Sequence, residues 1–288
     1  MRFSYAESMV DPAFYVPLAQ AAEEAGYHSF VVPDSICYPA VSDATYPFNP
    51  DGTREFLEDK PFLEPFSLIP ALGAVTSTIR FVTFVVKLPI RHPVLVAKQA
   101  ASVAVLCQDR FSFGVGSSPW PEDYAVTGVA WAGRGRRMDE QLAVIRGLLG
   151  GDYFEFHGEF YDIPAVKMAP VPDKAVPILV GGHGDAALRR AASSDGWLHG
   201  GGDPDALPGL LERLRAHRAE TERTGDFEIH VISADAYTPV GIRRLEDQGV
   251  TDVIVGFRWP YTVGADTEAL TTKIDHLRRF ADDVIAKV

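Results

Sequence analysis

Short apolar runs alternate with amphipathic segments along the chain, and this alternation constrains the fold more than any other feature. Eight runs rich in β-branched and aromatic residues predict strands at residues 2–5, 28–33, 79–87, 111–116, 177–181, 196–199, 228–233 and 252–257. They are apolar almost throughout, which is typical of strands buried on both faces of a parallel sheet. Eight strands, each followed by a helix, predict a closed (β/α)8 TIM barrel in a single domain, 1–288.

Helix start signals support this interpretation. A capping side chain precedes proline at Asp11-Pro12, Asp203-Pro204 and Thr238-Pro239, and Pro93 opens the helix after the third strand. Proline suits the first helical position because its missing N–H would have no partner there. An open doubly wound sheet is the alternative, but the segment "YAESMVDP" after the first strand lacks the glycine fingerprint of that fold.

Three connecting segments are longer than simple turns. They are 35–64 after the second strand, 117–134 after the fourth strand, and 151–176 between the fourth helix and the fifth strand. The first two leave the carboxyl ends of strands, where TIM-barrel active sites lie, so we expect them to carry function. The third contains "YFEFHGEFYD", which predicts a hairpin turning at His157-Gly158.

Charge and composition exclude several classes of protein. The 27 basic and 39 acidic residues give a net charge of −12, which disfavours nucleic acid and anionic membranes as partners. No apolar run approaches the roughly 18 residues of a membrane span, and the N-terminus lacks the pattern of a secretory signal. Two distant cysteines indicate neither a disulfide framework nor a zinc cluster, and no metal site is expected. We expect a soluble cytoplasmic protein that acts on a small molecule.

Polar residues and glycines gather where the predicted strands end. Asp34 follows the second strand, Lys87 ends the third, and Ser117 follows Gly116 after the fourth. The carboxyl ends of barrel strands meet at one face, so we expect these residues to lie around a common mouth. Asp34 is a hydrogen-bond acceptor for a ring N–H or hydroxyl, and Lys87 is a candidate anion contact.

The segment "LVGGHGDAALRRAA" (179–192) carries the most specific of these signals. Gly181, Gly182 and Gly184 surround His183 at the point where a strand leads into a helix. Successive backbone N–H groups at a helix start form an anion site, so this turn is a candidate phosphate contact. Aromatic residues in the rim segments are expected to wall a pocket for a ring system, namely Tyr38, Tyr46, Trp120, Phe257, Trp259 and Tyr261.

The sequence does not single out a general acid or base. Ser35 and Glu122 are the candidate catalytic residues, and Tyr38 and His183 are further possibilities. Glu122 and Asp235 also allow a non-redox alternative, a glycoside hydrolase, which needs two carboxylates at the barrel mouth.

Several motifs, in order from the second strand to the last, are similar to one known family. They are "VVPDSICYP", "RFVTFVVKLPIRHPVLVAKQAASVAVL", "DRFSFGVGSSPW", "GRGRRMDEQLAVIRGLL", "FHGEFYDI", "PILVGGHGDAALRRAASSDGWL" and "GVTDVIVGF". Together they resemble the luciferase-like monooxygenase superfamily, and within it the coenzyme F420-dependent oxidoreductases. The resemblance implies a TIM barrel with insertions that transfers a hydride between the deazaflavin F420 and an organic substrate. An FMN-dependent monooxygenase of the same superfamily is the alternative. A homodimer is also expected by analogy.

The resemblance also assigns residues around the cofactor. It matches Asp34 to a cofactor contact and the stretch Phe84–Val86 to a strand bulge with a non-prolyl cis peptide beneath the ring. Lys87 lies just beyond this bulge, and Gly181-Gly182 match the region near the phosphate-bearing tail. Ser117 falls in the matching turn after the fourth strand.

Two departures argue against glucose 6-phosphate as the substrate. In the family's sugar-phosphate dehydrogenase a histidine follows the strand-2 aspartate and a glutamate lies in the strand-4 loop, whereas this chain has Ser35 and Pro119. The loop after the sixth strand also lacks that enzyme's phosphate clamp and has the sequence "HGGG" (199–202) instead.

Overall fold

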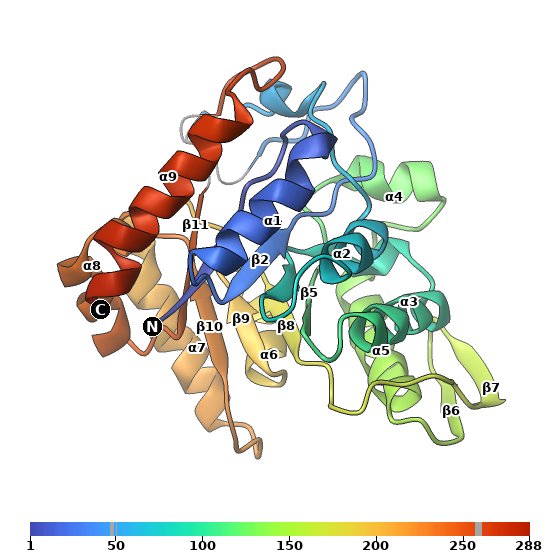
Figure 1. The fold of residues 1–288 in the computed structure, drawn as a ribbon. Coiled ribbons are helices and arrows are strands. Elements are labelled where there is room, and N and C mark those ends of the chain that lie inside the picture. Colours follow the sequence, from blue (N-terminus) through green and yellow to red (C-terminus); the bar gives the residue numbers. More distant parts are fainter. Residues whose placement is uncertain (47–48, 50, 257–260) are drawn as a thin grey trace.

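Parallel strands form a closed barrel in a computed structural model that describes residues 1–46, 49, 51–256 and 261–288 (Figure 1). The order in the sheet is β3-β2-β1-β11-β10-β9-β8-β5-β4, and a further pairing of β3 with β5 closes the ring. The barrel strands are β1 (Arg2–Tyr5), β2 (Ser29–Val32), β3 (Arg80–Thr83), β4 (Val86–Lys87), β5 (Phe111–Gly116), β8 (Ile178–Gly181), β9 (Gly196–Leu198), β10 (Glu228–Val231) and β11 (Asp252–Val255). The predicted TIM barrel is confirmed.

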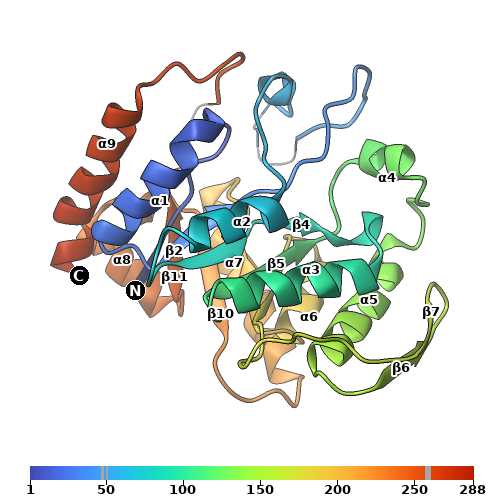
Figure 2. The same cartoon turned by 45° about the vertical axis from the view of Figure 1, so that its right-hand side comes forward.

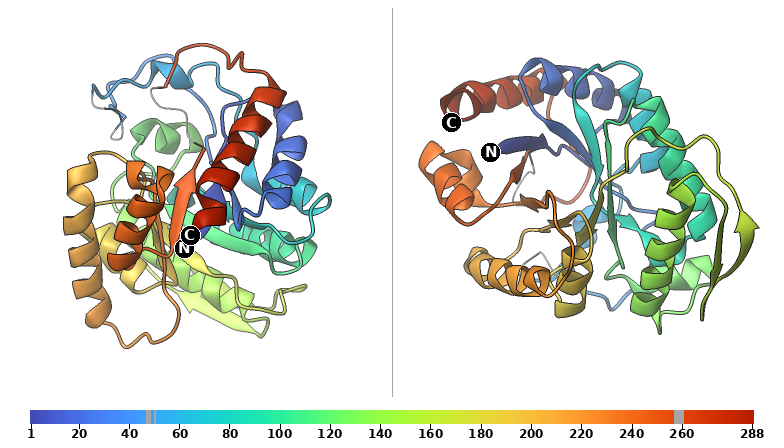
Figure 3. Two further views of the ribbon diagram at one scale, coloured as in Figure 1. Left: turned by 60° about the vertical axis from the view of Figure 1, so that its left-hand side comes forward. Right: turned by 90° about the horizontal axis from the view of Figure 1, so that it is seen from below.

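Helices surround the barrel, as the view along its axis in Figure 3 shows. They are α1 (Tyr15–Glu24), α2 (Pro65–Gly73), α3 (Pro93–Leu106), α4 (Pro121–Thr127), α5 (Arg134–Leu149), α6 (Asp185–Ala192), α7 (Leu207–Ala219), α8 (Pro239–Asp247) and α9 (Leu270–Asp283). Short 3₁₀ helices span Pro12–Phe14, Glu55–Leu57, Leu88–Ile90, Pro204–Ala206, Ala234–Tyr237 and Ile285–Lys287. None of the helices in the described ranges is long and apolar enough to cross a membrane.

The predicted prolines stand at helix starts. Pro93 is the first residue of α3, and Pro239 is the first residue of α8, where the Thr238 side chain accepts the N–H of Gly241. The last helix, α9, begins at Leu270, after a segment that forms neither helix nor strand in its described residues. There the Nζ of Lys273 lies 2.6 Å from the carboxylate of Asp266.

The predicted strand 79–87 is interrupted. β3 and β4 are separated by Phe84 and Val85, which are joined by a cis peptide bond at the place that the family resemblance implied. Both pieces still pair with β5. Gly114 in β5 permits the offset, because a Cβ at this position would lie 1.8 Å from the carbonyl oxygen of Thr83.

The two rim insertions lie at the same end of the barrel. The 35–64 segment and α4 both stand over the carboxyl ends of the strands, and Figures 1 and 2 show them on the same side of the molecule. The third insertion forms the antiparallel pair β6 (Phe154–His157) and β7 (Asp162–Val166), which confirms the predicted hairpin. It lies outside the barrel beside α5 (Figure 2), away from the rim insertions.

Apolar side chains fill two regions of the core. A large cluster packs between the strands and the helices. A smaller one fills the barrel interior, with Phe84, Val85 and Ile232 packed against its six members Ala6, Val31, Val82, Leu179, Leu198 and Ile254. The barrel is therefore a solid core, and ligands are confined to its mouth.

Candidate active site

A cavity of about 600 Å³ occupies the barrel mouth. Residues that follow strands from around the whole ring line it, among them Met9, Asp34, Val85, Ser117, Gly182, Gly200 and Ile232. Because parallel strands all end at this face, residues remote in sequence share one enclosed space.

Most of the predicted cofactor contacts meet in this cavity. They are Asp34, Val85, Lys87, Ser117, Gly181, Gly182, His183 and Gly184. Val86 differs, because its side chain is fully buried in the core between sheet and helices. Successive side chains of an extended strand point to opposite faces, so Val85 faces the barrel interior and Val86 faces away.

Val85 forms a raised part of the cavity floor between two glycines. A Cβ on Gly116 would lie 2.7 Å from one methyl carbon of Val85, and a Cβ on Gly181 would lie 2.9 Å from the other. Any larger residue at either strand end would push this side chain out of place. The two glycines therefore set the shape of the floor, and they explain why β5 and β8 both end in glycine.

Asp34 fixes the backbone at the end of β4. One carboxylate oxygen accepts the N–H of Lys87 at 2.9 Å, and the other accepts a guanidinium N–H of Arg91 at 2.9 Å. Arg91 also donates to the carbonyl oxygen of Lys87. Asp34 thus lies at the cavity wall as predicted, and its carboxylate positions the strand end and neutralises a basic side chain.

Lys87 ties the barrel to the insertion after β5. Its Nζ lies 2.8 Å from the carboxylate of Asp123 in α4, and both side chains are buried. Ser118 donates a second hydrogen bond to the same carboxylate at 2.6 Å. The positive charge of Lys87 is therefore already compensated inside the protein.

The glycine turn after β8 lines the cavity beside the N-terminus of α6. Gly182 has a φ of +124°, a conformation that strongly favours glycine, and its carbonyl oxygen accepts the indole N–H of Trp197 at 2.9 Å. Gly184 then caps α6, whose N-terminus faces the cavity. Asp185, the acidic residue of this first turn, is paired with His217 and Arg189.

Two imidazoles stack at the edge of this turn. The rings of His183 and His199 are 4.6 Å apart and nearly parallel, and the Nε2 of His183 accepts the N–H of Gly200. Burial lowers the pKa of His183, with a further contribution from Arg213, and burial together with His183 lowers the pKa of His199 to about 3. Both rings are therefore neutral near pH 7, so His183 contributes no positive charge to the cavity.

Arg134 is a cavity residue that the sequence analysis missed. It is the first residue of α5, and its guanidinium lies 3.7 Å from the ring centre of Trp131. Both residues line the cavity. Within the described parts of the chain Arg134 forms no ion pair, so its charge is uncompensated. Arg134 lies in the motif "GRGRR". From the sequence alone it could not be distinguished from the two other arginines of that motif, so it was not predicted to line the cavity.

An aromatic wall faces the glycine floor. Tyr46 and Trp120 are stacked with ring centres 5.9 Å apart, and Phe56 and Tyr261 are stacked at 4.4 Å. All four line the cavity. Burial raises the pKa values of Tyr46 and Tyr261, so both phenols are protonated at neutral pH. Of the other aromatic residues predicted at the mouth, Phe257 and Trp259 lie outside the described residues.

The candidate catalytic residues lie in a smaller side pocket of about 140 Å³. Ser35, Tyr38 and Glu122 line it together with Arg54. Asp235, the other carboxylate of the hydrolase alternative, pairs with Arg244 beside α8. The structure thus does not bring Glu122 and Asp235 together as a glycosidase pair.

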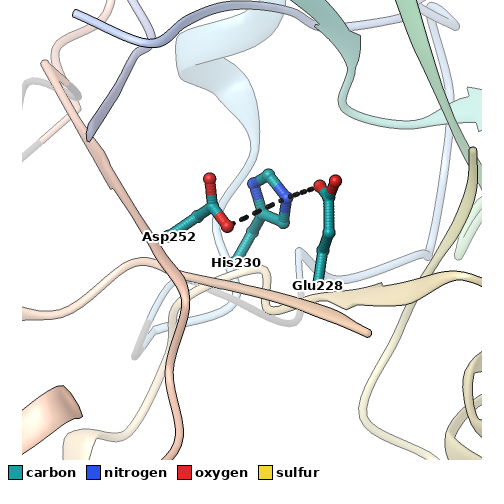
Figure 4. Close-up of side chains that lie close together, drawn as sticks. All are labelled: Glu228, His230 and Asp252. Atoms are coloured by element: carbon teal, nitrogen blue, oxygen red, sulfur yellow. Dashed lines mark hydrogen bonds and ion pairs between the residues drawn. The ribbon is translucent and has the colours of Figure 1, made fainter. Parts of the chain in front are cut away.

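A separate ionic cluster lies at the opposite end of the barrel. Figure 4 shows His230 between the carboxylates of Glu228 and Asp252, with its Nε2 2.7 Å and 3.6 Å from them. These groups are close enough to hold a metal ion, but Arg2 already makes two hydrogen bonds to Asp252. Burial acts to raise the pKa values of Glu228 and Asp252. Their contacts with His230 and Arg2 outweigh burial, so both pKa values lie below those of free carboxyl groups. We interpret the cluster as a structural clamp between β1, β10 and β11.

Comparisons with known proteins agree with this architecture. An uncharacterized protein of Mycobacterium tuberculosis is 63% identical over 288 residues, which cover the whole of both chains. An F420-dependent secondary alcohol dehydrogenase, solved with an F420–acetone adduct, superposes with a TM-score of 0.76 at 15% identity over 100% of this chain and 99% of the other. The oxygenating constituent of a Pseudomonas putida 3,6-diketocamphane monooxygenase, solved with FMN, gives 0.62 at 18% identity over 85% and 71%.

The two solved structures share the fold, but their low identity does not transfer their cofactors or substrates. The family assignment rests on the sequence, because the family model described as luciferase-like monooxygenase matches residues 3–238. The protein therefore belongs to the luciferase-like monooxygenase family.

Proposed function

We propose that the protein is an F420-dependent oxidoreductase that transfers a hydride between coenzyme F420 and a small organic substrate. The observation that carries this proposal is the cradle formed by Val85, Gly116 and Gly181 opposite the aromatic wall in a cavity of about 600 Å³. This space suits a flat tricyclic ring, and any side chain on the two glycines would displace Val85 from the floor.

The anionic tail of the cofactor would reach the N-terminus of α6. Backbone N–H groups of the 182–184 turn provide neutral donors there, and Arg134 provides an uncompensated positive charge on the same cavity. Both candidate cofactors have an anionic tail, since F420 carries a phosphodiester and several carboxylates and FMN carries a phosphate monoester. Lys87 is already neutralised by Asp123, so among the described residues Arg134 is the expected contact for the phosphate group of either cofactor.

F420 supplies a ring carbon that accepts or donates a hydride, and the chain's own residues bind, orient and exclude water. Asp34 keeps the end of β4 in place by holding both Lys87 and Arg91. Tyr46 and Trp120, carried by the two insertions, cover the outer side of the cavity. The alternative with FMN uses the same cavity and differs in the charge that the tail site must compensate.

Direct titration separates the two cofactors. Purified protein is titrated with F420, FMN and NADPH while fluorescence or heat is recorded, and Arg134→Met is titrated in parallel. We expect F420 to bind at least tenfold more tightly than FMN, and Arg134→Met to weaken F420 binding at least tenfold. Tight binding of FMN with no binding of F420 would show that the choice of cofactor is wrong.

A further inference from the structure

The side pocket beside the main cavity contains polar groups that the fold leaves without partners. It shares Leu57, Phe62, Lys87 and Trp120 with the main cavity, so a ligand in one space can extend into the other. Arg54 comes from the 35–64 insertion and Glu122 comes from the first turn of α4.

Arg54 lies against two aromatic rings and, within the described chain, has unsatisfied N–H donors. Its buried guanidinium lies 4.6 Å from the ring centre of Trp120 and 5.6 Å from that of Tyr38. These contacts place the cation over the two rings but satisfy none of its N–H donors with a hydrogen-bond acceptor. Among the described residues these donors make one contact, at 3.6 Å to Glu122, which is longer than a hydrogen bond.

Glu122, as far as the structure describes its surroundings, lacks hydrogen-bond donors for its carboxylate. Its Oε2 is buried and has no hydrogen-bond partner in the described part of the chain. Buried carboxylate oxygens are almost always paired, because an unpaired one loses the hydration that it has in water. The neighbouring charges do not meet this need, since Lys87 is paired with Asp123 and Lys60 donates to the carbonyl oxygen of Gly264.

Arg54 and Glu122 thus form a loose ion pair at 3.6 Å, and neither side chain makes a short hydrogen bond among the described residues. A carboxylate ligand would satisfy Arg54 but place a second negative charge beside Glu122. An ammonium ligand would satisfy Glu122 but lie beside the guanidinium. A neutral carboxamide suits both side chains, because its carbonyl oxygen accepts from Arg54 while its N–H donates to Oε1 of Glu122, the oxygen 3.6 Å from Arg54.

We propose that Arg54 and Glu122 form a binding site for a carboxamide group of the substrate, with the rest of the substrate extending into the main cavity. The assignment of this ligand as a substrate rests on the proposed oxidoreductase function. The recognition itself is a property of the side pocket and can be measured without turnover.

Benzamide and benzoate test whether the pocket prefers a neutral carboxamide to a carboxylate, because the two compounds have nearly the same size and differ in charge. Their dissociation constants are measured by titration calorimetry or ligand-observed NMR with wild-type protein, Arg54→Met, Glu122→Gln and, as a control, Glu58→Gln. Glu58 is an exposed carboxylate on the same pocket. We expect wild-type protein to bind benzamide at least tenfold more tightly than benzoate, and Arg54→Met to lose at least tenfold in benzamide affinity.

Glu122→Gln is the decisive variant. It removes the negative charge and adds an amide donor, so benzoate affinity should rise at least fivefold, while Glu58→Gln leaves the preference unchanged. Tighter binding of benzoate than benzamide by wild-type protein, or no binding of either, would overturn the proposal even if the variants fail to fold. The affinity for F420 is measured on the same samples. A failure of F420 to bind would contradict the proposed cofactor, whereas a failure of benzamide to bind would contradict the carboxamide site.

Discussion

The carboxylate of Asp34 lies 2.9 Å from the guanidinium of Arg91, and the same carboxylate accepts the backbone N–H of Lys87. Arg91 also donates a hydrogen bond to the carbonyl oxygen of Lys87. The side chains of Asp34 and Arg91 together therefore hold the backbone N–H and C=O of Lys87, a residue on the cavity wall. The turn between β4 and α3 therefore has a structural use. Its Arg91 anchors the end of β4 before α3 begins.

Replacing this carboxylate should cost both stability and ligand binding. Asp34→Asn leaves the partly buried Arg91 without its counter-charge, which we expect to lower the free energy of unfolding by about 3 kcal/mol. Denaturant unfolding measures the change, and F420 titration measures the expected loss of affinity. Arg91→Met should recover part of the stability in the double variant, because it removes the stranded charge. Full additivity of the two substitutions would contradict a direct pair.

The glycine cradle predicts a steric effect that a second substitution relieves. Gly116→Ala should destabilise the protein by about 1–3 kcal/mol, because its Cβ would overlap the Val85 side chain. Val85→Ala in the same chain removes the overlapping methyl groups and should restore at least half of the loss. Gly209→Ala in α7 is the control, since nothing lies within 4 Å of a Cβ there. If Gly116→Ala costs as much in the Val85→Ala background as in the wild-type chain, overlap is not the cause.

The buried imidazole of His199 predicts acid sensitivity. Its pKa is about 3 in the folded protein and about 6.5 when unfolded, so between these values the unfolded chain binds the extra proton. Its contribution to stability is complete above about pH 6.5 and falls with pH, by about 2 kcal/mol between pH 7 and pH 5. His199→Phe retains a ring against His183 and removes this titration. Unfolding at the two pH values should show a smaller acid loss in the variant, and an unchanged loss would assign the effect elsewhere.

The clamp at the other end of the barrel should matter for stability and not for the cavity. Asp252→Asn removes the partner of Arg2 and a neighbour of His230, which should cost about 2 kcal/mol in unfolding free energy, since Arg2 is partly exposed. F420 affinity should stay within twofold of wild type. Added Zn²⁺ should leave the unfolding temperature unchanged, whereas a zinc-dependent rise that disappears in Asp252→Asn would make the cluster a metal site.

The barrel was predictable because its signals are local and repeated. Apolar strands and helices that begin near a proline recur along the chain, and each strand–helix pair independently indicates the same architecture. The interruption of the third strand is different, because it depends on the contact of Thr83 with Gly114 across the sheet. From the residues alone 79–87 formed one apolar run, and only the family resemblance pointed to the bulge.

The placement of several residues at the cavity was predictable for a similar reason, whereas their role as a site stays a prediction. Residues at strand ends converge in any parallel barrel, so Asp34, Lys87 and the glycine turn were found from their positions. Their partners were not, because the pairing of Lys87 with Asp123 and the stacking of Arg54 on Trp120 depend on how the insertions fold back. The proposed homodimer and cytoplasmic location stay predictions.

Arg54 and Tyr46 both come from the 35–64 insertion, whose described residues take no part in the pairing of the barrel strands. Changes of length or sequence in this segment leave the cradle and the clamp intact while they replace one wall of each pocket. Homologues that diverge mainly there should keep the same cofactor and accept different compounds, so this segment is the place to exchange when new selectivity is sought on an unchanged scaffold.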